Sequence, residues 1–331
     1  MNYIGSKHRL SEFIKTTVKE VCGDDLSQQT FCDLFAGTGS VGRNFKSLVK
    51  SVVANDLEYY SYVLNRNYIG NHKEIHSESY FQELNNLEGI PGFLFNHYGE
   101  GGDSKRLYFS KENAQKIDAI RQKIEKWKHT GKISEDTYFL LLASLIESAD
   151  KIANTASVYG AFLKAVKKAA RTPIKLEPAT FDKTTTRHTV YQEDGNILVK
   201  RITGDILYLD PPYNVRQYGA NYHILNTIAK YDTFAPRGKT GLRIYNKSAY
   251  CSSVKVVAAF DELIKNAQFK YIFLSYNNEG LMPPDIVRQV MQRYGKYDLA
   301  TVAYKRFKAD KTTSRNHKAV GTTEYLHILE K

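Results

Sequence analysis

Apolar residues along the first part of the chain alternate between helical and extended spacing. From residue 6 to 20 they fall three or four positions apart, which is the spacing of one buried helix face. Compact apolar runs at 30–35 and 51–54 predict strands, and helical spacing follows them at 41–49 and 57–69. Strand, turn, helix, strand and helix in this order are typical of the opening of a doubly wound α/β sheet.

The pattern changes between residues 76 and 189. Clusters of Pro and Gly interrupt this stretch, and its strongest signal is an apolar helix predicted at 138–152. Extended apolar segments return after it, at 206–209, 271–275, 299–305 and 324–329. We therefore expect an α/β sheet that is interrupted by a largely helical insertion.

Composition narrows the range of partners. A chain of 331 residues, 42% of them hydrophobic, can bury a core without disulfide or metal staples. Its 47 Lys and Arg against 35 Asp and Glu give a formal net charge of +12, which favours polyanions and, among soluble partners, nucleic acid first. Ribosome-associated and membrane-surface proteins share this property, so charge alone does not decide between them.

Targeting and metal signals are missing from the sequence. The N-terminus lacks the apolar core of a secretory peptide, and no uncharged apolar stretch approaches about 18 residues, so we expect a cytoplasmic protein without a membrane partner. Cys22, Cys32 and Cys251 show no metal-ligand spacing and predict buried, reduced thiols. His72 and His76 stand four residues apart without a further ligand, which favours a solvated helix face and no metal.

A glycine-rich turn stands between the first predicted strand and its helix. Gly37, Gly39 and Gly42 follow the G-x-G-x-x-G pattern, which lets a ligand approach the backbone closely. Asp56 ends the next strand, where a carboxylate can accept hydrogen bonds from ribose hydroxyls. The pattern fits a nicotinamide dinucleotide and S-adenosylmethionine equally well, because both carry an adenosine ribose. A plain tight turn is the third interpretation.

The most informative segment is the apolar run 206–209, which leads straight into Asp210-Pro211-Pro212-Tyr213. Two prolines remove two N–H donors and fix φ, so the strand has to end in a rigid turn. Open α/β sheets bind their ligands at such strand ends. The Asp210 carboxylate and the backbone carbonyls are acceptors, and the Tyr213 ring is a flat face. Acceptors beside a stacking face suit the exocyclic amino group of a planar base; a buried structural turn is the alternative.

With these motifs in place, the chain resembles the D12 class of adenine-specific DNA methyltransferases, relatives of the Dam enzymes. Four segments carry the resemblance: Asn2–Lys7, Asp33–Gly39, Val53–Asp56 and Asp210–Tyr213. Their order, with an insertion before the last, is similar to the alpha arrangement of amino-methyltransferases. The resemblance implies a Rossmann-like S-adenosylmethionine-dependent sheet of about seven strands. Residues 1–75 and 190–331 would form this catalytic domain, and 76–189 a target-recognition insertion.

The resemblance also implies roles for single residues. Tyr3 and Lys7 would contact the cofactor, Asp56 its ribose, and Asp210 would lie between cofactor and substrate amine. The segment Tyr191–Asp194 resembles the acid-bearing segment before the catalytic motif, which makes Asp194 a candidate partner for the cofactor's adenine. The cofactor-binding set is then Tyr3, Lys7, Asp33, Phe35, Gly37, Gly39, Asp56, Asp194 and Asp210, and the catalytic set is Asp210, Pro211, Pro212 and Tyr213.

The expected reaction is methyl transfer from S-adenosylmethionine to the N6 amino group of adenine in double-stranded DNA, with the base flipped out of the stack. A restriction–modification system would be its setting, in a prokaryotic or phage context, with a cognate endonuclease as a partner. Methylation of cytosine N4, RNA as substrate, and a DNA-binding regulator with an inactive core stay open. Asp at position 210 favours adenine, by resemblance. The sequence does not indicate the recognition site, the presence of a partner endonuclease or the oligomeric state.

Two further segments are candidates for DNA contact. The polar and aromatic loop 214–223 offers Arg216, Gln217 and Asn221 for phosphates or the orphaned partner base, and Tyr218 or Tyr222 for stacking. Residues 305–318 hold six Lys and Arg against one Asp and predict a basic hairpin loop on the DNA backbone. An ordered loop on the sheet and a merely solvated loop are the alternatives. In the second segment the expected contacts are Lys308, Lys311 and Arg315.

Overall fold

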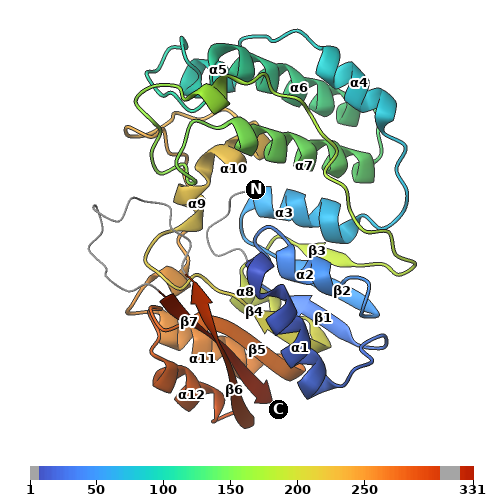
Figure 1. Cartoon of the computed structure of the whole chain (residues 1–331), viewed down its shortest axis with the longest axis vertical. Coiled ribbons are helices and arrows are strands. Elements are labelled where there is room, and N and C mark those ends of the chain that lie inside the picture. The colour runs from blue at the N-terminus through green and yellow to red at the C-terminus, as the bar shows by residue number, and fades with distance from the viewer. Residues whose placement is uncertain (1–6, 306–320) are drawn as a thin grey trace. The chain divides into compact units, whose positions relative to one another are not determined.

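The computed structural model describes residues 7–305 and 321–331 and divides into two compact units (Figure 1). The helical unit consists of Glu58–Thr185 and Tyr218–Asn246. The sheet unit consists of the remaining described residues, 7–57, 186–217, 247–305 and 321–331. Since the chain passes between the units several times, neither unit is a continuous segment.

The sheet unit is built on seven strands in the order β3-β2-β1-β4-β5-β7-β6. The strands β1 to β5 pair in parallel, and β7 runs antiparallel to both of its neighbours, β5 and β6. The strand order reverses between β1 and β4, which is the point where open α/β sheets bind ligands. The predicted fold class is confirmed. The strands are β1 (Thr30–Asp33), β2 (Ser51–Asn55), β3 (Thr189–Tyr191), β4 (Thr203–Leu209), β5 (Gln268–Asn277), β6 (Lys296–Lys305) and β7 (Gly321–Glu330).

Side chains along β4 alternate between the two faces of this sheet, and both faces are packed. Leu207 and Leu209 belong to an apolar cluster with helices α11 and α12, whereas Tyr208 between them stacks on Phe31. The Phe31 ring lies 4.1 Å from the ring of Phe45 in α2, so α2 covers the opposite face. The short element β3 was not predicted, because three partly exposed residues at the sheet edge show no apolar run. Figure 1 shows the helices of this unit: η1 (Lys7–Leu10), α1 (Ser11–Cys22), α2 (Ser40–Phe45), α8 (Gly195–Leu198), η4 (Ala249–Cys251), α11 (Val256–Asn266) and α12 (Pro284–Met291).

The predicted helices of this unit are present with shifted ends. The first consists of η1 and α1, and the second ends at Phe45, four residues earlier than expected. Beyond Phe45 the backbone bonds tighten, with Lys46 N donating to Arg43 O and Leu48 N to Phe45 O, and these turns lead the chain into β2. Cys32 and Cys251 are buried as expected, but Cys22 is only half-buried.

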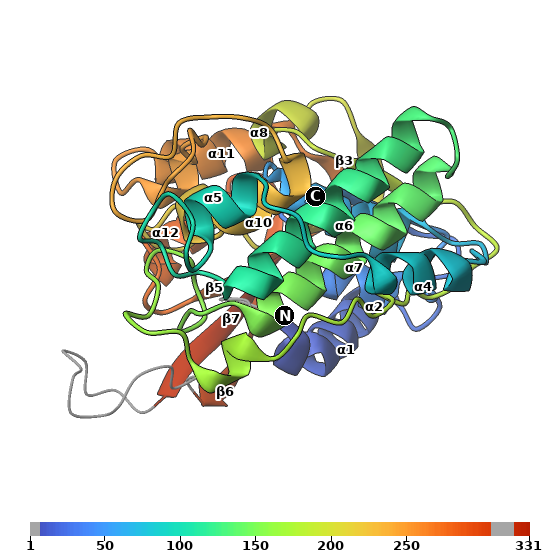
Figure 2. The same ribbon diagram turned by 90° about the horizontal axis from the view of Figure 1, so that it is seen from above.

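The helical unit is organised around α6 and α7, which lie side by side (Figure 2). The predicted helix at 138–152 is confirmed and begins earlier, at Glu135, because the Ser134 hydroxyl caps it by accepting from Thr137 N at 3.1 Å. The helices of this unit are α3 (Tyr59–Asn65), η2 (Arg66–Gly70), α4 (Glu78–Asn86), α5 (Phe93–Tyr98), α6 (Lys111–His129), α7 (Glu135–Ile152), η3 (Lys168–Arg171), α9 (Tyr218–Asn221) and α10 (His223–Lys230).

The boundaries of the helical unit differ from the predicted insertion at 76–189. The unit begins at Glu58, because α3 packs on α7 and α10. Tyr60 N donates to the Asn226 side chain at 3.0 Å, which draws the segment of α10 into the same unit. Periodicity identifies the buried face of a helix but not the partner that covers it, so the sequence pattern assigned α3 to the sheet.

Two further expectations can be compared with the structure. His72 and His76 lie in an irregular segment between η2 and α4, not on a helix, since the helical run ends at Gly70. Among the described residues, no group of three or more His, Cys, Asp or Glu is placed to hold a metal ion. Nor is any helix in the described part of the chain long and apolar enough to cross a membrane.

Candidate active site at the carboxyl ends of the strands

The glycine turn after β1 is held by two strand-end carboxylates. Gly37 and Gly39 have φ angles of +53° and +78°, a conformation that residues with a side chain rarely adopt. Gly37 N donates to Asp56 Oδ2 at 2.8 Å, and Gly42 N donates to Asp33 Oδ2 at 3.0 Å. The structure therefore brings the predicted turn together with Asp33 and Asp56, at the ends of β1 and β2.

Asp33 lies beneath the turn and is 1% exposed. Burial raises the pKa of Asp33 to about 8, although the Gly42 N–H acts in the opposite direction. Its second oxygen, Oδ1, accepts no hydrogen bond from the described residues. A buried carboxyl group with one oxygen unused can still bond to a polar group of a ligand.

Asn55, the last residue of β2, has a role that the Val53–Asp56 segment did not indicate. The buried Asn55 amide donates to Leu34 O and Glu193 O, each at 3.1 Å, and accepts from Glu193 N at 3.0 Å. Asn55 thereby fixes the loops after β1 and β3 against β2. The only sequence signal was its position directly before Asp56 at a strand end.

Asp194 and Phe35 lie at this same edge. The Asp194 carboxylate caps α8 by accepting from Asn196 N and Ile197 N, at 2.9 and 3.2 Å. The half-buried Phe35 ring stands edge-on to Tyr250, with ring centres 5.1 Å apart. The observed role of Asp194 is to cap a helix, while Phe35 offers an apolar ring beside it.

Asp210, directly after β4, forms an ion pair with Lys7. The Lys7 Nζ atom lies 3.3 Å from Asp210 Oδ1, and the two side chains are 7% and 18% exposed. Burial raises the pKa of Asp210 to about 6, and the Lys7 charge opposes the shift. The two carboxylates near Lys7 raise the pKa of its ammonium, more than offsetting burial, so it stays charged at neutral pH. Lys7, predicted to touch the cofactor, thus lies on Asp210, the carboxylate that is predicted to be catalytic.

A second carboxylate reaches the same ammonium. Glu324 on β7 places Oε2 3.7 Å from Lys7 Nζ, and its side chain is 10% exposed. Its position follows from strand register, because Glu324 pairs with Asn277 at the carboxyl end of β5. Sequence reasoning missed Glu324, since no motif surrounds it; a charged residue inside a predicted apolar strand was the only signal.

The rest of the turn that is predicted to be catalytic is rigid. Pro211 is buried, Pro212 and Tyr213 are half-buried, and Leu281 N donates to the Tyr213 carbonyl at 3.0 Å. Burial raises the pKa of the Tyr213 phenol, with Lys7 opposing and Asp210 adding to the shift. The phenol is therefore neutral at physiological pH, and the ring packs on the edge of the apolar cluster under the sheet.

Comparison with known proteins identifies the family. Residues 3–290 match the model of the D12 class N6 adenine-specific DNA methyltransferases. The chain belongs to this family. Its reaction is methylation of adenine N6 in DNA, with S-adenosylmethionine as the methyl donor.

Curated relatives cover the chain from end to end. It is 61% identical over 332 residues to the Type II methyltransferase M.NlaIII of Neisseria lactamica, covering 100% of this chain and 99% of the relative. It is 36% identical to the Type II methyltransferase M.CviAII of Paramecium bursaria Chlorella virus 1, covering 99% and 98%. Identity to the Type II methyltransferase M.FokI of Planomicrobium okeanokoites is 37%, and there all of this chain spans 53% of the relative.

The residues present in this D12-class chain fit S-adenosylmethionine. The turn at Gly37 and Gly39 presents backbone without side chains, and Asp33 Oδ1 is a buried oxygen without a hydrogen bond from the described residues. Asp56 stands at the end of β2, where its carboxylate can accept from ribose hydroxyls, and the Phe35 ring gives an apolar face. These groups have the mixture of apolar and polar character that a sulfonium nucleoside requires.

The loop after the catalytic turn contains the predicted DNA contacts of this methyltransferase, and the structure distributes them between the units. Arg216 is exposed, while the Gln217 side chain accepts from Ser248 N at 2.9 Å. Tyr218 and Asn221 bound α9 of the helical unit. Tyr222 is fully buried and is unsuited to stack on a base, which corrects that expectation. Tyr3, Lys308, Lys311 and Arg315 lie outside the described residues.

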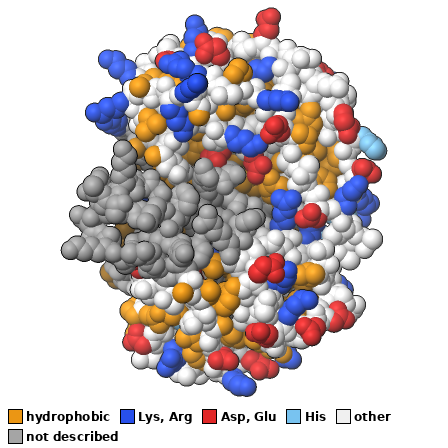
Figure 3. Space-filling view, viewed as in Figure 1, with side chains coloured by type: hydrophobic (Ala, Val, Ile, Leu, Met, Phe, Trp, Pro, Cys, Tyr) orange, Lys and Arg blue, Asp and Glu red, His pale blue; other side chains and the backbone are white. Residues whose placement is uncertain are grey.

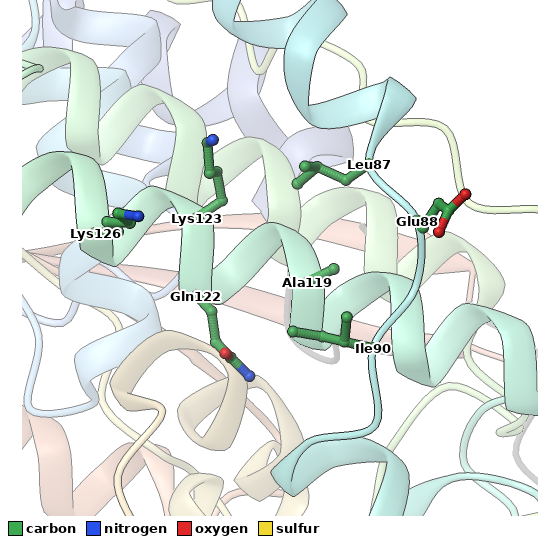
Figure 4. Close-up of a pocket in the computed structure, with 7 residues that line it drawn as sticks. All are labelled: Leu87, Glu88, Ile90, Ala119, Gln122, Lys123 and Lys126. Carbon is green, nitrogen blue, oxygen red and sulfur yellow. The ribbon is translucent and has the colours of Figure 1, made fainter.

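A groove in the helical unit lies along α6, facing the segment between α4 and α5 (Figure 4). None of the predicted site residues lines it. Its charged members are one acid, Glu88, and two lysines, Lys123 and Lys126. The lining residues are Leu87, Glu88, Ile90, Ala119, Gln122, Lys123 and Lys126.

Proposed function

We propose that this chain is the modification enzyme of a restriction–modification system, and that it methylates adenine within one short sequence of double-stranded DNA. The observation that carries the proposal is Asp210, held by Lys7 at the switch point of the sheet and followed by the rigid turn to Tyr213. The names of the relatives as Type II methyltransferases support the setting. A cognate endonuclease acting on the same sequence is the expected partner, in the cytoplasm of a bacterium or of a virus-infected cell.

The catalytic turn would position the substrate amine. The N6 atom is inaccessible inside the duplex, so the adenine has to be flipped out at a cost of a few kcal/mol. Stacking on the Tyr213 ring offsets part of that cost, since base–aromatic stacking contributes roughly 1–3 kcal/mol. Asp210 and the Pro211 carbonyl then accept the two amine hydrogens and orient the nitrogen lone pair.

Lys7 would decide which oxygen of Asp210 does this. Its ammonium lies on Oδ1, so Oδ2 is the oxygen left for the amine. S-adenosylmethionine supplies the electrophilic methyl group. The contribution of the protein is therefore to place one acceptor and one ring so that the lone pair faces that methyl group.

The cofactor would lie along the ends of β1, β2 and β3. We assign Asp56 to the ribose and the turn at Gly37 and Gly39 to close backbone approach. Asp33 would receive a polar group through its unused oxygen, and Phe35 would pack on the adenine. Asp194 would act near the adenine only indirectly, as the helix cap that orders this edge of the sheet.

The helical unit would choose the DNA sequence. Figure 3 shows Lys and Arg gathered over this unit near α5. Lys105, Arg237 and Lys239 are exposed residues of this unit, and Arg106 donates to His97 O in α5 as well as to Gly238 O and Lys239 O, at 3.1 and 3.2 Å. We call these four basic residues the basic edge. Together with Arg216, Gln217, Tyr218, Asn221, Lys308, Lys311 and Arg315 they are the proposed DNA contacts.

Sequencing of DNA from cells that express the chain tests this function. With a readout sensitive to base modification, we expect N6-methyladenine in one short sequence context and none in cells carrying the empty vector. Methylated cytosine in its place would overturn the assignment to adenine. Unmodified DNA, from a chain that binds S-adenosylhomocysteine and DNA in vitro, would indicate a regulator with an inactive core.

A further inference from the structure

Glu324 is an unusual side chain to find beside Asp210. It is 8% exposed and lies on β7, and its Oε2 accepts no hydrogen bond from any described residue. Among the described residues, the positive group within ion-pair distance is the Lys7 ammonium at 3.7 Å, which is already paired with Asp210 at 3.3 Å. One buried cation is thus shared by a buried carboxylate, Glu324, and a half-buried one, Asp210.

This arrangement is not explained by stability. Lys7 and Asp210 alone form a neutral pair, and a second buried carboxylate adds a desolvation cost unless its oxygens are well bonded. Glu324 Oε2 lacks such bonds among the described residues. The charges of Lys7, Asp210 and Glu324 sum to one negative charge, and the uptake of one proton would bring the cluster to neutrality.

The reaction proposed above produces such a proton. When the nitrogen–methyl bond forms and the sulfur–methyl bond breaks, sulfur keeps the electron pair and N6 becomes positively charged. One N–H proton then has to leave, and its bonding electrons return to nitrogen as the lone pair of the methylated amine. In the arrangement proposed above, Asp210 Oδ2 already accepts an amine hydrogen, because Oδ1 is paired with Lys7. Oδ2 is therefore the acceptor for this proton.

We propose that Glu324 is a positioning residue that acts through Lys7: it holds the ammonium on one oxygen of Asp210 and readies the other oxygen to take the proton from the methylated amine. With Glu324 in place, Lys7 keeps a carboxylate partner after Asp210 is neutralised. Without it, protonation of Asp210 would leave a buried ammonium unpaired, which is strongly unfavourable. This inference rests on the proposed methylation of an amine.

Several groups shift the pKa of Asp210. Burial and the Glu324 charge from β7 raise it, whereas Lys7 from η1 lowers it. Asp33 from β1, Tyr208 from β4 and Tyr213 from the turn also interact with Asp210 or its charge. Since Glu324 is the carboxylate that shares Lys7, its removal should lower the pKa of Asp210, both by loss of its charge and by full transfer of Lys7 to Asp210.

The test compares Glu324→Gln with wild type in two measurements. The first follows the Asp210 carboxyl by carbon-13 NMR against pH in the absence of substrate, with its signal assigned from Asp210→Asn. The second is the pH profile of the single-turnover methylation rate. We expect Glu324→Gln to lower the midpoint of both by roughly one pH unit, with unchanged affinity for S-adenosylhomocysteine.

Two variants separate charge from shape and position. Glu324→Asp keeps the charge and should keep the wild-type midpoint. Glu330→Gln removes a negative charge from the exposed end of the same strand and should leave both midpoints unchanged. If Glu324→Gln titrates as Glu330→Gln does, or only lowers the melting temperature, the role of Glu324 is wrong. If Glu324→Gln lowers the NMR midpoint of Asp210 as expected but the wild-type chain methylates no DNA, the proposed function is overturned instead.

Discussion

Buried carboxylates in the two units differ in how completely they are hydrogen-bonded. In the helical unit, Asp118 accepts from Leu94 N, Phe95 N and the Tyr231 hydroxyl, at 2.9, 2.8 and 2.6 Å, and so caps α5. In the sheet unit, Asp33 Oδ1 and Glu324 Oε2 are equally buried but accept no hydrogen bond from the described residues.

Arg121 of the helical unit is bonded as Asp118 is. It is 2% exposed and donates to Ile228 O and Ala229 O, both at 3.0 Å, which completes the end of α10. Buried polar groups whose hydrogen bonds are complete stabilise a fold, because each would be costly to leave unpaired. Those with incomplete bonding are available to a ligand. The comparison therefore associates Asp118 and Arg121 of the helical unit with architecture, and makes Asp33 and Glu324 of the sheet unit the candidates for chemistry.

Removing Asp210 should have the largest effect on activity. We expect Asp210→Ala to lose roughly 100- to 1,000-fold or more in the methylation rate, because the loss of one preorganised group at a reacting centre has effects of this size. The variant should stay folded and bind DNA, since Lys7 keeps Glu324 as its partner. Single-turnover rates and DNA affinity check this. Activity within tenfold of wild type would remove Asp210 from the catalytic site.

Removing Asp118 should act on stability instead. Asp118→Ala leaves Leu94 N and Phe95 N without their acceptor, so we expect the free energy of unfolding to fall by about 2–4 kcal/mol. Urea unfolding measures it. Below the melting temperature, affinity for S-adenosylhomocysteine should equal that of wild type. Lost cofactor affinity in a fully stable Asp118→Ala variant would contradict the division between the units.

Tyr213 tests whether a ring in the sheet unit serves a substrate or the packing. If it stacks on the flipped adenine, Tyr213→Phe should remain substantially active, and Tyr213→Ala should lose roughly tenfold to a hundredfold in kcat/KM. Fluorescence of 2-aminopurine at the target position should rise less with the Ala variant. A role in packing alone predicts that both variants lose activity and melting temperature together.

Asp33 should give the smallest effect, on stability against pH. Its folded pKa of about 8 lies above that of an unfolded Asp, so its contribution to stability is complete at low pH and is lost as pH rises toward 8. Between pH 7 and 8, wild type should lose about 1 kcal/mol relative to Asp33→Asn, which does not titrate. Urea unfolding of both proteins in the absence of cofactor measures the difference; parallel pH dependence would show that Asp33 is ionised in the fold.

Local chemistry explains what could be predicted from the sequence. The turn at Gly37 and Gly39 needs positive φ angles, and the two prolines after Asp210 have to end a strand wherever they stand. Apolar spacing likewise located the long helix α7 and six of the seven strands. Each of these signals is complete within a few consecutive residues, so the amino-acid sequence is sufficient to predict the fold class and the positions of the two turns at the strand ends, whose roles in binding cofactor and in catalysis stay predictions.

Tertiary structure alone decided how distant segments share charges and faces. Glu324 reaches Lys7 because β7 runs antiparallel beside β5, and no local pattern records that pairing. The apolar face of α3 is satisfied by any apolar partner, and only the packed helical unit shows that α7 and α10 cover it. Hydrophobic burial does not depend on direction or on the identity of the neighbour, so the sequence specifies which faces are buried, whereas the packed chain determines which residues meet there.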